Sequence, residues 1–134
     1  MQSSKINDKR QKIELEFPMH CSANTLFNYI SSPSGLSSWF ADDVSVHGGN
    51  YVFKWDDGEM REAELVKNVN RKHIKFRWID NENPHDYLEF IIHKDEITDD
   101  LALIIVDYAE EEDMDELEMV WENQVQNLKK QIGA

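Results

Sequence analysis

The sequence predicts an α+β domain in which a curved antiparallel sheet of six or seven strands surrounds a long C-terminal helix. Short segments of alternating apolar and polar residues are joined by connections of hairpin length, which make neighbouring strands antiparallel. Two short helical segments follow the first strand, and a long amphipathic segment closes the chain. A helix about 30 Å long cannot bury its own apolar stripe, so the sheet must curl and hold the helix in its concave face.

The first elements are a strand and two short helices. Apolar and charged residues alternate over residues 11–17, as in a strand with one buried face, and we expect Pro18 to end it. Ser22 has the side chain of a helix cap, and Pro33 is a favoured first residue for a second, very short helix. The residues expected to face inward are Leu26, Phe27, Ile30, Leu36, Trp39 and Phe40.

Six further strands are expected after these helices. They cover residues 44–47, 51–55, 61–68, 72–78, 87–93 and 101–108. Gly48, Gly49 and Asn50 form a hairpin signal between the first two of them. Residues 101–108 are apolar on both faces, which is typical of a central strand that is buried on both sides.

Residues 110–134 carry the pattern of the long helix. Its apolar residues recur at three- and four-residue steps, and they are Leu117, Val120, Trp121, Val125, Leu128 and Ile132. Carboxylates in the first turns and Lys129 and Lys130 in the last turn match the two ends of the helix dipole. We expect Gly133 to end the helix.

Length and charge bound the possible functions. A chain of 134 residues predicts a single domain, 1–134, with residues 1–10 as a flexible leader. The 27 acidic and 14 basic side chains give a net charge of -13, and such a field repels nucleic acids and anionic membranes, so neither is an expected partner. The N-terminus lacks the apolar core of a secretory signal, and the single Cys21 cannot form an internal disulfide, so we expect a cytoplasmic protein.

Five segments, together with the order of the elements, carry a resemblance to a known family. The segments are 32–42 (SPSGLSSWFAD), 51–55 (YVFKW), 74–78 (IKFRW), 98–108 (TDDLALIIVDY) and 121–129 (WENQVQNLK). They resemble the START-like superfamily, also called the helix-grip or SRPBCC fold, and within it especially the homologues of the heat-shock ATPase activator and the small START-like proteins of Bacteroidetes. The resemblance implies the helix-grip fold. It leaves the function open, because lipid carriers, hormone receptors, polyketide cyclases and chaperone activators share this scaffold.

Apolar residues between the expected sheet and helix are the candidate ligand contacts. They are Trp39, Phe53, Trp55, Phe76, Trp78, Phe90, Leu117 and Trp121. Side chains of this kind line the cavities that hold apolar ligands. Bulky rings also fill protein cores, and the sequence alone leaves both interpretations open.

Four polar residues are candidate anchors for a ligand: Arg77, Glu89, His93 and Asp107. A buried carboxylate beside a cation would be ionised, whereas an isolated one would have a raised pKa and could act as an acid or a base. Such residues more often lie on the solvent face of a half-buried sheet. An enzyme of the cyclase or hydrolase type would need at least two of them to converge in the cavity.

No cofactor and no metal ion is expected. The five histidines are scattered singly, without the close pairs of a zinc site, and the chain has no glycine-rich phosphate loop. The acidic loop 80–86 lacks the glycine and the terminal glutamate of an EF-hand.

The leading hypothesis is a non-enzymatic domain that binds a small apolar molecule or lipid between the sheet and the helix. An alternative is a co-chaperone-like module that contacts a protein partner through the acidic residues 110–118, although these also fit the solvated start of a helix. An enzyme is the second alternative. For the oligomeric state we expect a monomer or a weak homodimer.

Overall fold

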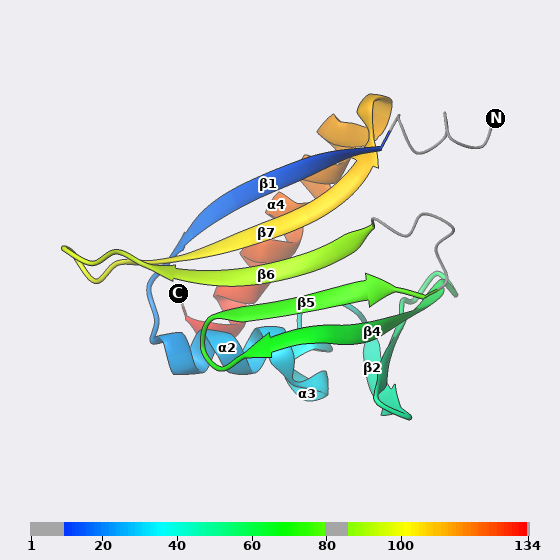
Figure 1. The fold of residues 1–134 in the computed structure, drawn as a ribbon, viewed down its shortest axis with the longest axis horizontal. Helices are drawn as coiled ribbons and strands as arrows, with labels where there is room; N and C mark the ends of the chain where they lie inside the picture. Colours follow the sequence, from blue (N-terminus) through cyan, green and yellow to red (C-terminus); the bar gives the residue numbers. More distant parts are fainter. Residues whose placement is uncertain (1–9, 80–85, 134) are drawn as a thin grey trace.

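The computed structural model describes residues 10–79 and 86–133, which form one antiparallel sheet with a long helix against its concave face (Figure 1). In chain order the elements are β1 (Arg10–Met19), α2 (Ala23–Ser31), α3 (Pro33–Leu36), β2 (Asp43–His47), β3 (Asn50–Lys54), β4 (Met60–Val69), β5 (His73–Trp78), β6 (Tyr87–Lys94), β7 (Leu101–Glu110), the 3-10 helix η1 (Glu111–Asp113) and α4 (Met114–Ile132). The predicted α+β class, the strands, the two short helices and the long terminal helix are confirmed.

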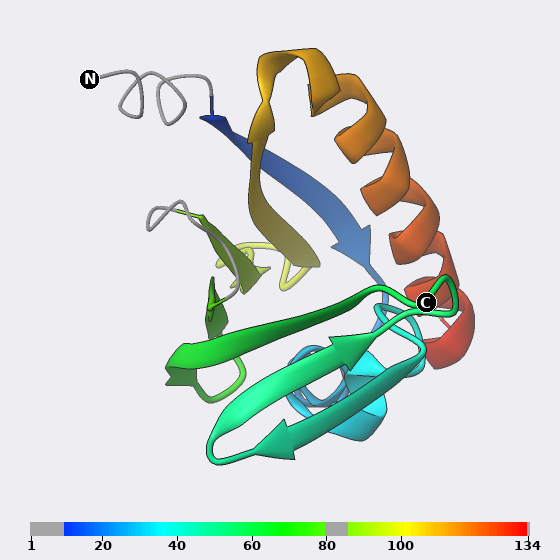
Figure 2. The same cartoon turned by 90° about the vertical axis from the view of Figure 1, so that its right-hand side faces the viewer.

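The seven strands follow the order β1-β7-β6-β5-β4-β3-β2, and every neighbouring pair is antiparallel. β7 lies between β1 and β6 and buries side chains on both faces, as its continuous apolar run predicts. A register shift between Leu65 and Lys67 places an extra residue in β4. Such a bulge bends a strand and increases its twist. In Figure 2 the half of the sheet that contains β2, β3 and β4 turns across the lower end of the molecule, while β1 and β7 run beside α4.

The core lies between the concave face of the sheet and the helices. α4 contributes the buried Trp121, Val125 and Leu128, and it contacts β1, β7 and α2. Ser22 caps α2, because its hydroxyl oxygen accepts the N–H of residue 25 at 3.1 Å. Gly133 ends α4 in the left-handed conformation, with φ of 72°. Both predicted helix boundaries are therefore confirmed.

Three local predictions are wrong. Pro18 does not end the first strand, since β1 continues to Met19; β1 is an edge strand, where a residue without an N–H is tolerated. Arg10 belongs to β1 and not to a leader, and the other leader residues, 1–9, lie outside the described part of the chain. Val120 is 44% exposed, because it lies at the edge of the apolar stripe of α4 and not beneath it.

Candidate functional site

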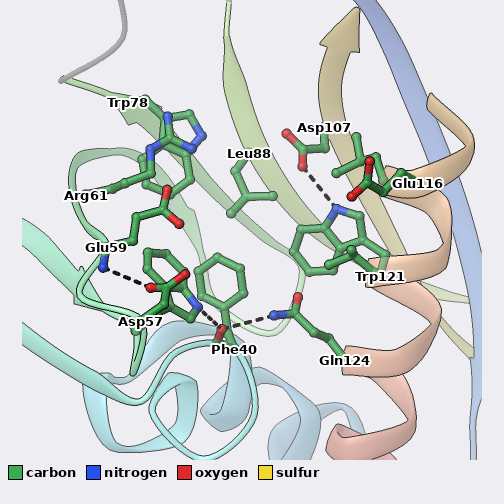
Figure 3. A pocket seen from close by; sticks show the side chains of 13 residues that line it. Phe40, Asp57, Glu59, Arg61, Trp78, Leu88, Asp107, Glu116, Trp121 and Gln124 are labelled. Atoms are coloured by element: carbon green, nitrogen blue, oxygen red, sulfur yellow. Dashed lines mark hydrogen bonds between the residues drawn. The ribbon is translucent and has the colours of Figure 1, made fainter. Parts of the chain in front are cut away.

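A pocket of about 600 Å³ opens between the curled sheet and α4 (Figure 3). Its volume is within the general range for small-molecule sites, about 300–1,000 Å³. The pocket forms only when the sheet curls, since residues distant in sequence line it. These are Phe40 after α3, Trp55, Asp57 and Glu59 around the β3–β4 turn, Arg61 of β4, Trp78 of β5, Leu88 of β6, Asp107 of β7, and Glu116, Leu117, Val120, Trp121 and Gln124 of α4.

Phe40 lies at the base of the pocket and connects its two sides (Figure 3). Its ring stacks on Trp121, with the ring centroids 5.6 Å apart and the planes 5° apart. Its carbonyl oxygen accepts two hydrogen bonds, from Trp55 Nε1 at 2.9 Å and from Gln124 Nε2 at 3.2 Å. The β3–β4 side of the pocket and α4 are therefore joined through one backbone group.

The short helix α3 holds Phe40 in this position. Ser32 caps α3 by accepting the N–H of Gly35 at 2.9 Å, and the N–H of Phe40 donates to the carbonyl of Leu36 at 2.9 Å. Gly35 allows α3 to lie close to α2, because a Cβ at this position would be 2.3 Å from the carbonyl oxygen of Asn28. The close contact between the two short helices thus sets the place of the pocket base.

Asp107 is the most deeply placed charged group of the pocket. Its Oδ2 accepts the indole N–H of Trp121 at 3.0 Å, and its Oδ1 accepts the backbone N–H of Tyr108 at 2.8 Å. Burial raises the pKa of Asp107 to about 6, while these two hydrogen bonds act in the opposite direction. The carboxyl group therefore titrates just below neutral pH and orients the Trp121 indole.

Charged side chains surround the opening of the pocket. The guanidinium carbon of Arg61 lies 3.8 Å from the ring centroid of Trp78. Asp57, Glu59 and Glu116 are exposed at the rim. The Asp57 carboxylate is held by the backbone N–H of Glu59, which donates to it at 2.9 Å. Together with the half-buried Asp107 of β7, four acidic groups line the pocket against one guanidinium.

The structure divides the predicted apolar residues into two groups. Trp55, Trp78, Leu117 and Trp121 line the pocket. The others are buried in the core beside it, where their rings meet in tilted or edge-on contacts, and they are Trp39, Phe53, Phe76 and Phe90. Aromatic residues therefore fill the core and also line a pocket, and Trp78 and Trp121, which are 6% and 3% exposed, do both.

Of the predicted polar anchors, only Asp107 lines the pocket. Arg77 and Glu89 alternate with the buried residues of β5 and β6, so they lie on the outer face of the sheet. There Arg77 pairs with a glutamate of β4 at 2.6 Å, Glu89 pairs with His73 at 2.8 Å, and His93 is exposed. The convergence of two of these residues, which the enzyme alternative requires, does not occur in this pocket.

Sequence reasoning missed most of the polar lining. Glu116 and Gln124 lie two four-residue steps apart on the flank of the α4 stripe, so helical periodicity could have indicated them. Arg61 and the residues of the β3–β4 turn offered no comparable signal. Only the curl of the sheet brings them opposite α4.

Within residues 10–79 and 86–133, no three His, Cys, Asp or Glu side chains are grouped so that they could hold a metal ion. In the same ranges no helix is long and apolar enough to cross a bilayer. The predicted acidic loop 80–86 lies outside the described residues except for Asp86, which is buried and pairs with Arg10.

A curled antiparallel sheet that holds a C-terminal helix, with a pocket between the two, defines the helix-grip class of proteins. The model of the START-like superfamily domain matches residues 7–134. The chain belongs to the START-like superfamily, and the resemblance inferred from its segments is confirmed.

Solved structures agree with this assignment. BfR322 from Bacteroides fragilis, a solution NMR structure, is 37% identical, with 92% of each chain covered and a TM-score of 0.65. The Aha1 dimer from Colwellia psychrerythraea is 16% identical over 89% of this chain and 93% of that chain, with a TM-score of 0.75. MLL2253 from Mesorhizobium loti is 12% identical over 92% of this chain and 97% of that chain, with a TM-score of 0.75. The last two show the fold alone. No curated protein matches the chain significantly.

Proposed function

We propose that this START-like domain binds a small, largely apolar molecule in the pocket between the sheet and α4, without catalysing a reaction. The observation that carries the proposal is a pocket of about 600 Å³ walled by the indoles of Trp55, Trp78 and Trp121. An apolar guest in contact with such walls gains about 25 cal/mol for each Å² of apolar surface removed from water.

The polar groups of the pocket support binding more than catalysis. Both oxygens of Asp107 already accept hydrogen bonds from the protein, one of them from the Trp121 indole. A carboxylate used in this way orients a wall of the pocket. The other two charged anchors that an enzyme of the cyclase type was expected to use, Arg77 and Glu89, are on the opposite face of the sheet.

Isothermal titration with a neutral apolar probe, 2-naphthaleneethanol, tests the proposal. Leu117→Trp places a larger side chain in the pocket wall and should weaken binding by about tenfold or more, which corresponds to ~1.4 kcal/mol. Met119→Trp is the matched control, because Met119 lies on the same helix, is 61% exposed and is absent from the pocket lining. This control should bind as the parent does.

Two results would contradict the proposal: no binding of the probe to the parent protein, or equal affinity of the parent and Leu117→Trp. Overpacking a well-filled site costs about 1–3 kcal/mol of stability. Thermal melts of both variants, recorded by circular dichroism, therefore accompany the titrations and show that the folded protein is compared.

A protein-interaction module is the second candidate function, and the exposed carboxylates at the start of the C-terminal helix favour it. These are Glu111, Glu112, Asp113, Asp115, Glu116 and Glu118. Binding of a basic partner at this surface would weaken in moderate salt. It would not respond to Leu117→Trp, so the same pair of variants separates the two functions.

A further inference from the structure

We propose that the ligand of this pocket is a small organic cation, with an ammonium group carried on an aromatic or short alkyl body. The inference rests on the proposed function, because it specifies the chemistry of the molecule that the same pocket binds.

The charges of the lining favour a cation. Asp57, Glu59, Asp107 and Glu116 face a single guanidinium, that of Arg61, so the formal charge of the lining is four negative charges against one positive. The net charge of the whole chain, -13, has the same sign. A cleft lined by one sign of charge concentrates ligands of the opposite sign at its opening.

The walls suit the same ligand. The faces of aromatic rings attract cations within about 6 Å of the ring centroid, and tryptophan is the strongest of these rings. Arg61 already lies over Trp78 at 3.8 Å, so the pocket holds one cation against an indole. Trp55 and Trp121 also line it, together with the exposed carboxylates of Asp57, Glu59 and Glu116. An ammonium group placed there would have aromatic rings on its apolar side and carboxylates toward the opening.

An anionic ligand fits the site less well. Arg61 would be its single cationic contact in the lining, and Asp57, Glu59 and Glu116 would repel it. A purely neutral ligand would leave the rim carboxylates without a role in recognition. The relative affinities of a cationic, a neutral and an anionic probe therefore distinguish these three ligand types.

Three probes with one naphthalene body measure this order by titration calorimetry at about pH 7.5 and low ionic strength, where charge effects are largest. They are the cation (2-naphthylmethyl)trimethylammonium, the neutral 2-naphthaleneethanol and the anion 2-naphthylacetate. We expect the cation to bind about tenfold more tightly than the neutral probe, and the anion to bind most weakly. Added salt should reduce the advantage of the cation and leave the neutral probe unchanged.

A pair of double variants assigns the effect to the rim. Glu59→Gln with Glu116→Gln removes two pocket carboxylates and should weaken binding of the cation by about three- to tenfold, without changing the affinity for the neutral probe. Glu112→Gln with Glu118→Gln removes two exposed carboxylates near the same helix but outside the pocket lining. This control carries the same change in net charge and should bind the cation nearly as the parent does.

Several outcomes would overturn the inference. Equal affinities for the cation and the neutral probe, or tighter binding of the anion, would reject it and leave the proposed function standing. Equal losses in the two double variants would reject it too, because net charge alone would then explain the effect. An equal loss for the cation and the neutral probe would show that the rim carboxylates support only the shape of the pocket. If no probe binds, the proposed function fails, and the inference fails with it.

Discussion

The protonation state of Asp107, a residue of the pocket, affects the stability of the fold. Burial raises its pKa from 3.8 to about 6. Between these two values the folded protein binds the proton more tightly than the unfolded chain does. The stability that this residue contributes is therefore fully present below pH 3.8, and it is lost as the pH rises through about 6.

Asp107→Asn should remove this pH dependence. One pKa unit corresponds to about 1.4 kcal/mol. Between about pH 4 and about pH 7 the parent loses stability that the variant keeps, so the free energy of unfolding of the variant minus that of the parent should rise by on the order of 2 kcal/mol. Urea denaturation at several pH values measures it. Glu118→Gln, which removes an exposed carboxylate of α4, is the control and should follow the parent. Parallel pH profiles of Asp107→Asn and the parent would refute the assignment.

The helix pair α2 and α3 depends on one glycine for its geometry. Gly35→Ala would place a Cβ 2.3 Å from the carbonyl oxygen of Asn28 and 2.7 Å from the Cα of Tyr29, both of them backbone atoms that cannot rotate away. We expect a loss of about 1–3 kcal/mol in the free energy of unfolding, together with weaker binding of the neutral probe, because α3 positions Phe40. Denaturant melts and calorimetry measure the two effects.

The matched control for this change is Ser34→Ala, the neighbouring residue of the same helix, which is exposed. Its effect should stay within about 0.5 kcal/mol. If Gly35→Ala were as stable as this control, α3 would have room to shift, and its role in holding the pocket base would be disproved.

Elements with a clear period were predictable, because the period follows directly from backbone geometry. The alternation in β5 and β6 placed Phe76, Trp78 and Phe90 inside, and the three- and four-residue steps of α4 placed Trp121 inside. The prediction that Pro18 ends the first strand was wrong, because a proline is tolerated in a strand at the edge of the sheet. Whether a strand lies at the edge is a property of the assembled fold.

The candidate site was less predictable than the elements, because it also depends on properties of the assembled fold. The same alternation indicates that Arg77 and Glu89 face outward, opposite the buried residues of their strands. They were chosen as candidate ligand anchors because their side chains are charged. Arg61 and Glu59 became part of the pocket because the bulged sheet curls toward α4. Contacts of this kind depend on strand order and curvature, which no local pattern of residues encodes.

The molecule as a whole carries 27 acidic and 14 basic side chains. Self-repulsion of such a charge destabilises the compact state. Raising NaCl from about 0.02 M to about 0.3 M shortens the screening length, so we expect the melting temperature to rise by a few degrees. Differential scanning calorimetry measures this shift.

The double variant Glu112→Gln with Glu118→Gln has two fewer negative charges, so its melting temperature should rise less with salt than that of the parent. A melting temperature that falls with salt would contradict the expectation. It would mean that attractive pairs, such as Arg77 with Glu64 on the outer face of the sheet, outweigh the repulsion.

The shared carbonyl oxygen of Phe40 limits the shape of guest that this molecule can admit. Trp55 and Gln124 donate to it from the two sides of the pocket, so moving α4 outward stretches at least one of these bonds. A planar guest can slide between the walls without that movement. A globular guest must first break a bond worth about 1 kcal/mol, and thickness is therefore a selection criterion that acts independently of charge.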